Sequence, residues 1–252
     1  MKNIIYIFLF LVVSSQLGMS ATRGDVKVLE ASENIRYLSQ KIVKDYLFYY
    51  KHSNQEEIKK TLHRELRELS RDLRIIATTT KDSDTKDILE FLAYSKDQIE
   101  EIFNTEVTEE NAALMLDYSE TLLEGADSIA RAHTYDFSAE EKMFMTTKKV
   151  EYLLERISKY YMAVHVGFDS TVNKEQMQSS MVNLEENLVQ VALYGYPTEI
   201  KNIQLDLDQA WSSNRTYLMM SKELFIPKLL SLSVVHMEKM ISQLALYHSK
   251  NQ

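Results

Sequence analysis

The sequence predicts an all-α protein built as two tandem antiparallel four-helix bundles. Turn-forming residues are scarce, since the 252 residues include 5 Gly and 2 Pro, whereas average usage would give about 18 and about 13. Apolar residues recur at spacings of three and four, which is the pattern of one helix face. This pattern returns 115 positions later along the chain. A few long helices in two copies agree with all three observations, and strand-rich folds are disfavoured.

Composition also limits the chemistry that the chain can perform. It has no cysteine, which removes disulfides, thiolate nucleophiles and Cys-ligated metal centres. Its formal net charge of −8 disfavours a nucleic-acid partner, because proteins that bind nucleic acids present a basic surface. The 45% of apolar residues is enough to bury real cores.

The N-terminal residues have the pattern of a secretory signal. Lys2 is followed by an apolar run from Ile4 to Val13 and by small residues at Ser20 and Ala21. We therefore expect a signal peptide over residues 1–21, cleaved near Ser20 to Ala21, and a periplasmic or secreted protein. The alternative is an uncleaved anchor, although the apolar run is shorter than the roughly 20 residues of a spanning helix.

Four helices are expected in the first half of the chain. The first carries its apolar face at Ile35, Leu38, Ile42, Tyr46 and Tyr49. A capping box of Ser53 and Glu56 opens the second, which we expect to end before Thr78. Asp82 starts the third helix and Thr108 caps the fourth.

The second half repeats this layout and begins with a further capping box at Ser138 and Glu141. Five residues recur unchanged after 115 positions: Tyr37, Leu38, Ile42, Lys44 and Tyr46 become Tyr152, Leu153, Ile157, Lys159 and Tyr161. Two domains follow, copy one over residues 22–136 and copy two over 137–252. The joint between them is short, so we expect two packed bundles and not two domains on a flexible linker.

The first helix contains a recognisable motif, since Arg36, Leu38, Ser39 and Gln40 match the string Q-R-M-L-S-Q-R, with Lys41 in place of the second Arg. This stretch resembles the N-terminal sensory domain of type IV pilus methyl-accepting chemotaxis transducers (PilJ-type). The resemblance covers copy one, and copy two keeps the helical layout without the motif. It implies a periplasmic four-helix sensor module that acts by contact with a membrane receptor or a histidine kinase.

In related sensor domains of nitrate-responsive kinases, the motif arginine clamps a small anion between the first helices of two subunits. The resemblance therefore implies a ligand site for a small anion; its candidate residues are Arg36, Ser39, Gln40 and Tyr46. A homodimer meeting through copy one would bring two Arg36 side chains together. If the two copies instead pair within one chain, Glu151 is the counterpart that we expect to face and neutralise Arg36. We favour pairing with the chain's own second copy, because a tandem copy has a high local concentration.

The second helix carries one basic stripe, formed by Lys60, Arg64, Arg67, Arg71 and Arg74. Acidic residues alternate with it and can pair at helical spacing, which favours a solvated face. Docking of an acidic partner on this stripe is the alternative interpretation.

The remaining features indicate packing. Aromatic residues near the end of the first helix and methionines in copy two are typical of core residues. The histidines form no metal-binding motif, and there is no phosphate-binding loop or nucleophile elbow. We therefore predict no catalytic residues, no metal and no cofactor. The leading function is a non-enzymatic sensory or ligand-binding module, and the alternative is a structural adaptor without a small-molecule ligand.

Overall fold

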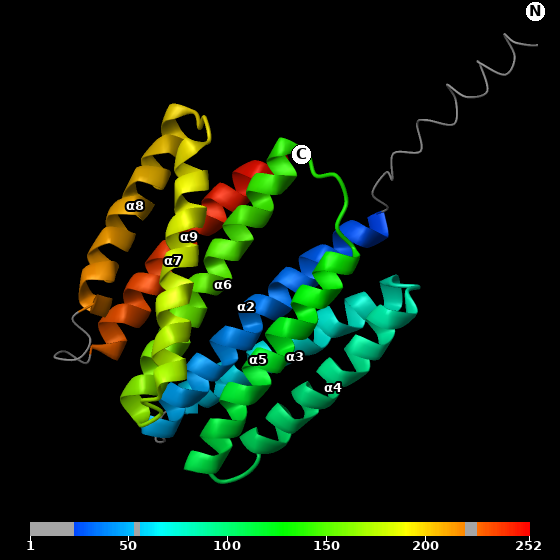
Figure 1. The fold of residues 1–252 in the computed structure, drawn as a ribbon, viewed down its shortest axis with the longest axis vertical. Helices are drawn as coiled ribbons and strands as arrows, with labels where there is room; N and C mark the ends of the chain where they lie inside the picture. Colours follow the sequence, from blue (N-terminus) through cyan, green and yellow to red (C-terminus); the bar gives the residue numbers. More distant parts are fainter. Residues whose placement is uncertain (1–22, 53–55, 220–225) are drawn as a thin grey trace, which may run out of the picture.

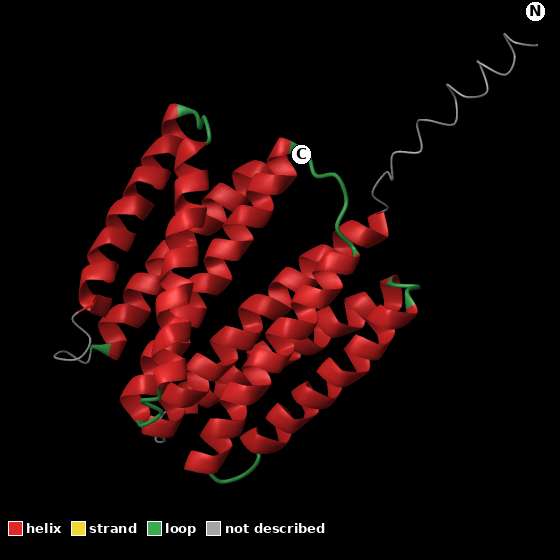
Figure 2. Ribbon diagram, in the orientation of Figure 1, coloured by secondary structure: helices red, strands yellow, loops and turns green. Residues whose placement is uncertain are grey.

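The computed structural model of the chain describes residues 23–52, 56–219 and 226–252, and Figures 1 and 2 show that these residues form helices and connecting loops only. The helices are α2 (Arg23–Lys51), α3 (Glu56–Thr79), α4 (Ser83–Phe103), α5 (Glu109–Ala132), α6 (Ala139–Val166), α7 (Thr171–Leu193), α8 (Thr198–Met219) and α9 (Pro227–Lys250). The prediction of an all-α fold is confirmed. The expected signal peptide and Ser53 of the first capping box lie outside the described residues.

Helices α2 to α5 form a ring in which each helix packs on its two neighbours. Apolar residues at helical spacing face its interior, and the largest fully buried ones include Ile35, Ile42, Tyr46, Leu69, Ile76, Leu92, Ile99, Met115 and Leu122. Helices α6 to α9 form a second ring of the same kind, with α8 packed mainly on α9. Trp211 of α8 is buried in this second core.

The two bundles meet through their first helices, because α2 packs along α6 (Figure 1). Contacts advance in the same direction on both helices, from Arg36 over Tyr152 to Lys44 beside Glu155, so α2 and α6 run parallel. The joint between α5 and α6 is only residues 133–138. The two copies therefore pair within one chain, with a long seam between equivalent helices.

Most helix boundaries follow the capping signals in the sequence. The side chain of Asp82 accepts a hydrogen bond from the Thr85 amide, and Thr108 does the same for its helix. Ser138 and Glu141 form the complete capping box at the start of α6. Pro227 occupies the first turn of α9, where its missing amide hydrogen costs nothing.

One predicted boundary is wrong, since α3 continues to Thr79 instead of ending before Thr78. The Thr78 hydroxyl donates to the carbonyl groups of Arg74 and Ile75, at 2.9 and 3.2 Å. A threonine that bonds back to the preceding turn is compatible with helical backbone. The run of three threonines therefore closes the helix gradually.

A histidine ties the ends of three segments together in each bundle. In copy one, His133 Nδ1 lies 3.0 Å from Asp25 Oδ1, and its Nε2 lies 3.2 Å from the Thr85 hydroxyl. In copy two, His248 Nδ1 lies 2.7 Å from Glu140 Oε2, and its Nε2 lies 2.8 Å from the Tyr196 hydroxyl. Each histidine thus joins the start of the first helix, the start of the third helix or the loop before it, and the end of the fourth helix.

Candidate functional site between the two bundles

The seam between α2 and α6 contains buried charges in place of a purely apolar contact. Lys44 of α2 lies 2.9 and 2.8 Å from the two carboxylate oxygens of Glu155 on α6, and Glu155 is fully buried. Lys44 also lies 3.3 Å from Asp45 Oδ1, while Lys41 lies 3.0 Å from Asp45 Oδ2. These residues form a cluster of two cations and two anions, which we call the seam cluster.

Mutual attraction favours the charged forms of Lys44 and Asp45. Burial alone would lower the pKa of Lys44, but the nearby carboxylates of Asp45 and Glu155 outweigh it and raise the pKa. Burial alone would raise the pKa of Asp45, but Lys44 and Lys41 outweigh it and lower the pKa. Because every charge has a partner of opposite sign, the seam cluster is neutral as a whole.

Two further carboxyl groups beside the seam cluster are raised in pKa. Burial, together with the charge of Glu155, raises the pKa of Glu238 on α9 to about 8. Burial, together with the charge of Asp45, raises the pKa of Glu65 on α3 to about 7. Burial and the neighbouring Glu155 thus favour the protonated form of Glu238, which can donate a hydrogen bond to Glu155.

A second charge cluster lies on the opposite side of the seam, where α5 and α7 flank α2 and α6. Lys159 of α6 is fully buried, donates to the Ser119 hydroxyl at 2.8 Å and pairs with Glu120. Arg156 makes two bonds to the carboxylate of Glu120, at 3.1 and 2.7 Å, and a third to Gln176 at 2.8 Å. Burial lowers the pKa of Lys159 to about 7, although Glu120 opposes this.

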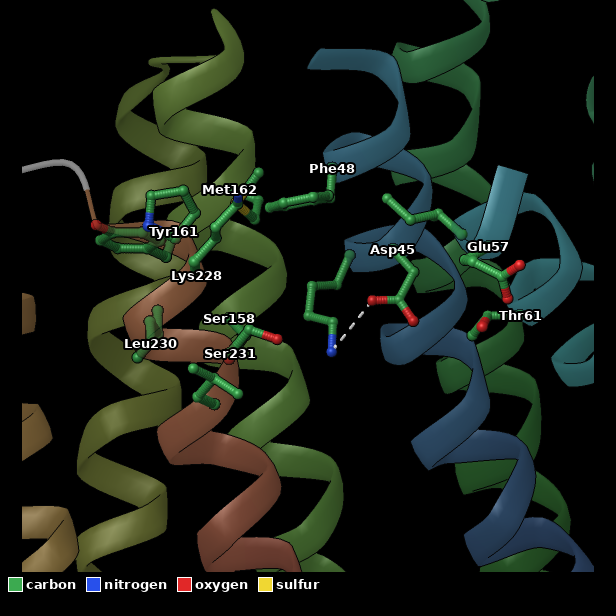
Figure 3. A pocket seen from close by; sticks show the side chains of 14 residues that line it. Asp45, Phe48, Glu57, Thr61, Ser158, Tyr161, Met162, Lys228, Leu230 and Ser231 are labelled. Carbon is green, nitrogen blue, oxygen red and sulfur yellow. Dashed lines mark ion pairs between the residues drawn. The ribbon is translucent and has the colours of Figure 1, made fainter. Parts of the chain in front are cut away.

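The side flanked by α3 and α9 contains a cavity of about 410 Å³, which we call the inter-bundle cavity. Its walls come from both copies, and Figure 3 shows side chains of α2 and α3 facing those of α6 and α9 across it. The lining residues are Lys44, Asp45, Phe48, Glu57, Ile58, Thr61, Ser158, Tyr161, Met162, Pro227, Lys228, Leu230, Ser231 and Leu232. Its size is within the range of small-molecule sites.

A wider and more polar groove of about 590 Å³ continues along the same side of the seam. Charged residues of α3, α6 and α9 line most of it, including Arg71, Glu151 and Lys239. Ser242 of α9 lies in its wall and donates to Glu151 at 3.2 Å. Tyr37, Leu38 and Val235 also line this groove, which differs from the inter-bundle cavity by its larger share of charged side chains.

The structure places Arg36 in an internal ion cluster. Its guanidinium lies 2.6 Å from Glu33, 2.8 Å from Asp127 and 4.4 Å from the centre of the Tyr152 ring. The expectation that Glu151 faces Arg36 is wrong, because Glu151 pairs with Lys148 at 2.8 Å. The residue opposite Arg36 is the next one along, Tyr152, and the neutralising carboxylates come from Arg36's own bundle.

The other three candidate ligand-binding residues do not converge with Arg36 on one cavity. Ser39 donates to the Arg36 carbonyl at 2.7 Å, and Gln40 donates to the Ser39 hydroxyl at 2.9 Å. The Tyr46 ring stacks on Phe103 inside the first bundle, with ring centres 5.9 Å apart. Tyr46, through this stacking, and Gln40, which also donates to the Ser119 carbonyl at 3.4 Å, join α2 to other helices of its own bundle.

The basic stripe lies on the exposed face of α3. All five of its members are exposed: Lys60, Arg64, Arg67, Arg71 and Arg74. Lys60 pairs with Glu57 at 2.7 Å and Arg71 lies 3.4 Å from Asp72. The exposed pair of Lys60 and Glu57 contributes little to stability, and the exposed side chains of the stripe are accessible to a partner.

Sequence reasoning missed the charged seam, although a signal for it was present. Lys44 and Lys159 occupy equivalent positions in the two copies and lie close to apolar residues of the same helix face. A lysine at such a position in both copies indicates a buried charge that needs a partner. The partners Glu155 and Glu120 come from other helices, so only the fold brings them together.

Fold and site together define a protein of two tandem four-helix bundles with a cavity at their seam. Comparisons with protein-family models, with curated proteins and with solved structures found no match to this chain. Within residues 23–52, 56–219 and 226–252, none of the helices has both the length and the apolar character needed to cross a bilayer. In the same residues, no three His, Asp or Glu side chains converge as metal ligands.

Proposed function

We propose that this chain is a non-enzymatic, periplasmic ligand-binding module of the sensory kind, in which a small molecule occupies the inter-bundle cavity. The single observation that carries the proposal is that both copies build this cavity, at the seam where their first helices meet. A ligand there touches α2 and α3 of copy one and α6 and α9 of copy two. Its binding energy therefore depends on how the two bundles sit against each other.

A ligand in this cavity would couple its binding to the relative position of the two bundles. A ligand shifts the balance between two arrangements only by the difference in its affinity for them. Directional contacts such as the pair of Lys44 and Glu155, at 2.8 Å, favour particular positions of α6 against α2. Ligand binding would favour one of these positions, and the outer helices would carry the change to a partner.

The partner in this proposal is a membrane receptor or a histidine kinase. Two sequence features support it, namely the secretory signal pattern over residues 1–21 and the resemblance of Arg36 to Gln40 to a transducer sensory domain. The exposed basic stripe of α3 offers a docking surface for an acidic face of that partner. Because α3 also lines the inter-bundle cavity, ligand occupancy would reach this surface directly.

A structural adaptor without a small-molecule ligand is the second candidate, and one observation favours it. Eleven of the fourteen large apolar side chains that are exposed in the described part of the chain belong to copy two. On α7, Val182, Val189 and Leu193 follow each other at spacings of seven and four, so they share one face. Exposed apolar surface of this kind is typical of protein contacts.

Labels on the two bundles test the sensory proposal. The chain has no cysteine, so Glu90→Cys on α4 and Gln209→Cys on α8, both exposed, can carry spin labels without background. Small metabolites are first screened by thermal shift, and hits are retained when Ser231→Phe, which fills the cavity, abolishes the shift. The matched control is Ser242→Phe in the neighbouring groove. Pulsed electron resonance then measures the distance between the labels.

The sensory proposal predicts at least one hit that requires Ser231 and changes the distance between the labels. A set of hits unaffected by Ser231→Phe would contradict the cavity as the ligand site. A bound compound that leaves the distance distribution unchanged would contradict the coupling and favour the adaptor.

A further inference from the structure

The inter-bundle cavity has no excess of charge. Its charged lining residues are two cations, Lys44 and Lys228, and two anions, Asp45 and Glu57. Glu57 and Lys228 are exposed, so water solvates them at the rim. Lys44 and Asp45 form the inner pair, with 3.3 Å between their charged atoms. A ligand that enters the interior therefore meets charges that already compensate each other.

Both members of the inner pair also contact further charged residues outside the cavity lining. Lys44 bonds to the buried carboxylate of Glu155, and Lys41 bonds to the second oxygen of Asp45 at 3.0 Å. An anionic ligand would have to compete with two carboxylates for Lys44, and a cationic ligand would have to lie beside Lys44. Either would lose its hydration without gaining an unpaired partner, which is unfavourable.

Apolar and aromatic side chains form much of the remaining wall. Phe48 projects from α2, and Tyr161 and Met162 project from α6 across the cavity from it (Figure 3). The Tyr161 hydroxyl accepts a hydrogen bond from the Ile226 amide at 2.9 Å, which fixes its ring. Aromatic rings and a thioether favour a flat or flexible apolar body.

Hydroxyl groups supply the polar contacts inside the cavity. Ser158 donates to the Leu154 carbonyl at 2.9 Å, so towards a ligand its oxygen can act as an acceptor. The Ser231 hydroxyl on α9 lines the same cavity from the other side. Neutral hydroxyls suit a ligand that carries a hydroxyl, carbonyl or amide group.

From these contacts we infer that the inter-bundle cavity takes a neutral amphipathic small molecule, with an aromatic or aliphatic body and an uncharged hydrogen-bonding head. This inference rests on the proposed function, because it assigns a ligand class to the same cavity. This ligand class differs from the small oxyanions that the resemblance of the first helix implies.

Three indole compounds with the same ring and different heads test the inference on the full chain. Tryptophol is neutral, indole-3-acetate is an anion and tryptamine is a cation at pH 7. The neutral dye N-phenyl-1-naphthylamine serves as the reporter, because its fluorescence rises in apolar surroundings, and each compound is titrated as its competitor. We expect tryptophol to displace the dye at a concentration about tenfold or more below that of either charged compound. A tenfold difference corresponds to about 1.4 kcal/mol, and burying a charge without a new partner costs at least this much.

Matched variants locate the binding. Ser231→Phe should abolish the rise in dye fluorescence, whereas Ser242→Phe, placed in the neighbouring polar groove, should keep it. If a charged indole displaces the dye as well as or better than tryptophol, and Ser231→Phe still abolishes binding, the ligand class is wrong while the proposed cavity stands. If Ser231→Phe binds the dye as the unmodified chain does, the cavity itself is not the site and both proposals fail.

Discussion

His248 lies 115 positions after His133 and makes the same kind of contact in its own bundle. The carboxylates that they contact, Asp25 and Glu140, are also 115 positions apart. Each histidine lies between a carboxylate at Nδ1 and a hydroxyl at Nε2, the hydroxyls being Thr85 and Tyr196. The sequence repeat is therefore also a repeat of tertiary contacts at one end of each bundle.

This relationship predicts that His248→Ala destabilises the protein. The imidazole is fully buried, and its removal leaves the Tyr196 hydroxyl without its partner in a buried place. We expect the free energy of unfolding to fall by about 1–3 kcal/mol. Urea denaturation followed by circular dichroism measures it.

His236→Ala is the matched control, because His236 is exposed on the same helix. It should change the free energy of unfolding by about 0.5 kcal/mol or less. Equal effects of the two substitutions would mean that the histidine contacts do not hold the end of the bundle.

Local patterns were sufficient to predict much of this fold. The apolar spacing and the side chains of Asp82, Thr108 and Ser138 placed most helices, because caps and amphipathic faces act within one or two turns. The seam could not be predicted in the same way. The partner of Lys44 is Glu155, 111 positions away, and only the packing of α2 on α6 brings them together.

The error about Arg36 has a similar origin. Matching the two copies correctly identified Glu151 as the equivalent position, but equivalence does not determine which side chains meet across a seam. Glu33 lies one turn earlier on the same helix as Arg36 and Asp127 lies on a helix of the same bundle, so both reach the guanidinium. With its charge compensated there, Arg36 contacts α6 through the face of the Tyr152 ring.

The seam cluster predicts that Lys44→Met strongly lowers the free energy of unfolding, and that this loss depends on the presence of Glu155. Glu155 is fully buried, so removing Lys44 takes away the cation that pairs with this carboxylate inside the protein. We expect a loss of about 3–5 kcal/mol in the free energy of unfolding. Adding Glu155→Gln should recover a large part of this loss, because the buried charge is then absent.

A double-mutant cycle measures this coupling from the single and double variants. Lys86→Met on the exposed face of α4 is the control and should have little effect. Additive effects of Lys44→Met and Glu155→Gln would contradict a direct interaction between the two bundles at this pair.

Stability should also depend on pH through Glu238, whose pKa is raised from the ordinary 4.5 to about 8. Between these two values the folded protein binds more protons at this group than the unfolded chain does. The contribution of Glu238 to stability is therefore fully present below about pH 4.5 and is lost as the pH rises through about 8. Glu238→Gln removes this titration.

We expect the melting temperature of Glu238→Gln, relative to that of the unmodified chain, to increase as the pH is raised from 5 towards 8. Above that range the difference should stay constant. Scanning fluorimetry across this range measures the difference. Glu90→Gln on the exposed face of α4 should show no such trend. A difference that is independent of pH would show that Glu238 is ionised in the folded protein throughout.

Arg36 gives the last prediction, which separates an internal ion cluster from an anion site. In the structure Arg36 compensates Glu33, whose side chain is only 4% exposed, so Arg36→Ala leaves a buried carboxylate. We expect a loss of about 1–3 kcal/mol, and Glu33→Gln in the same chain should reduce it. Nitrate should neither raise the melting temperature nor promote a dimer through Arg36, because its guanidinium is already paired with Glu33 and Asp127. Thermal shift and light scattering with increasing nitrate, against chloride at equal ionic strength, measure both. An anion at a hundred times its dissociation constant would stabilise the protein by about 2.7 kcal/mol, so a nitrate-specific gain of this size that disappears in Arg36→Ala would make Arg36 a ligand residue after all.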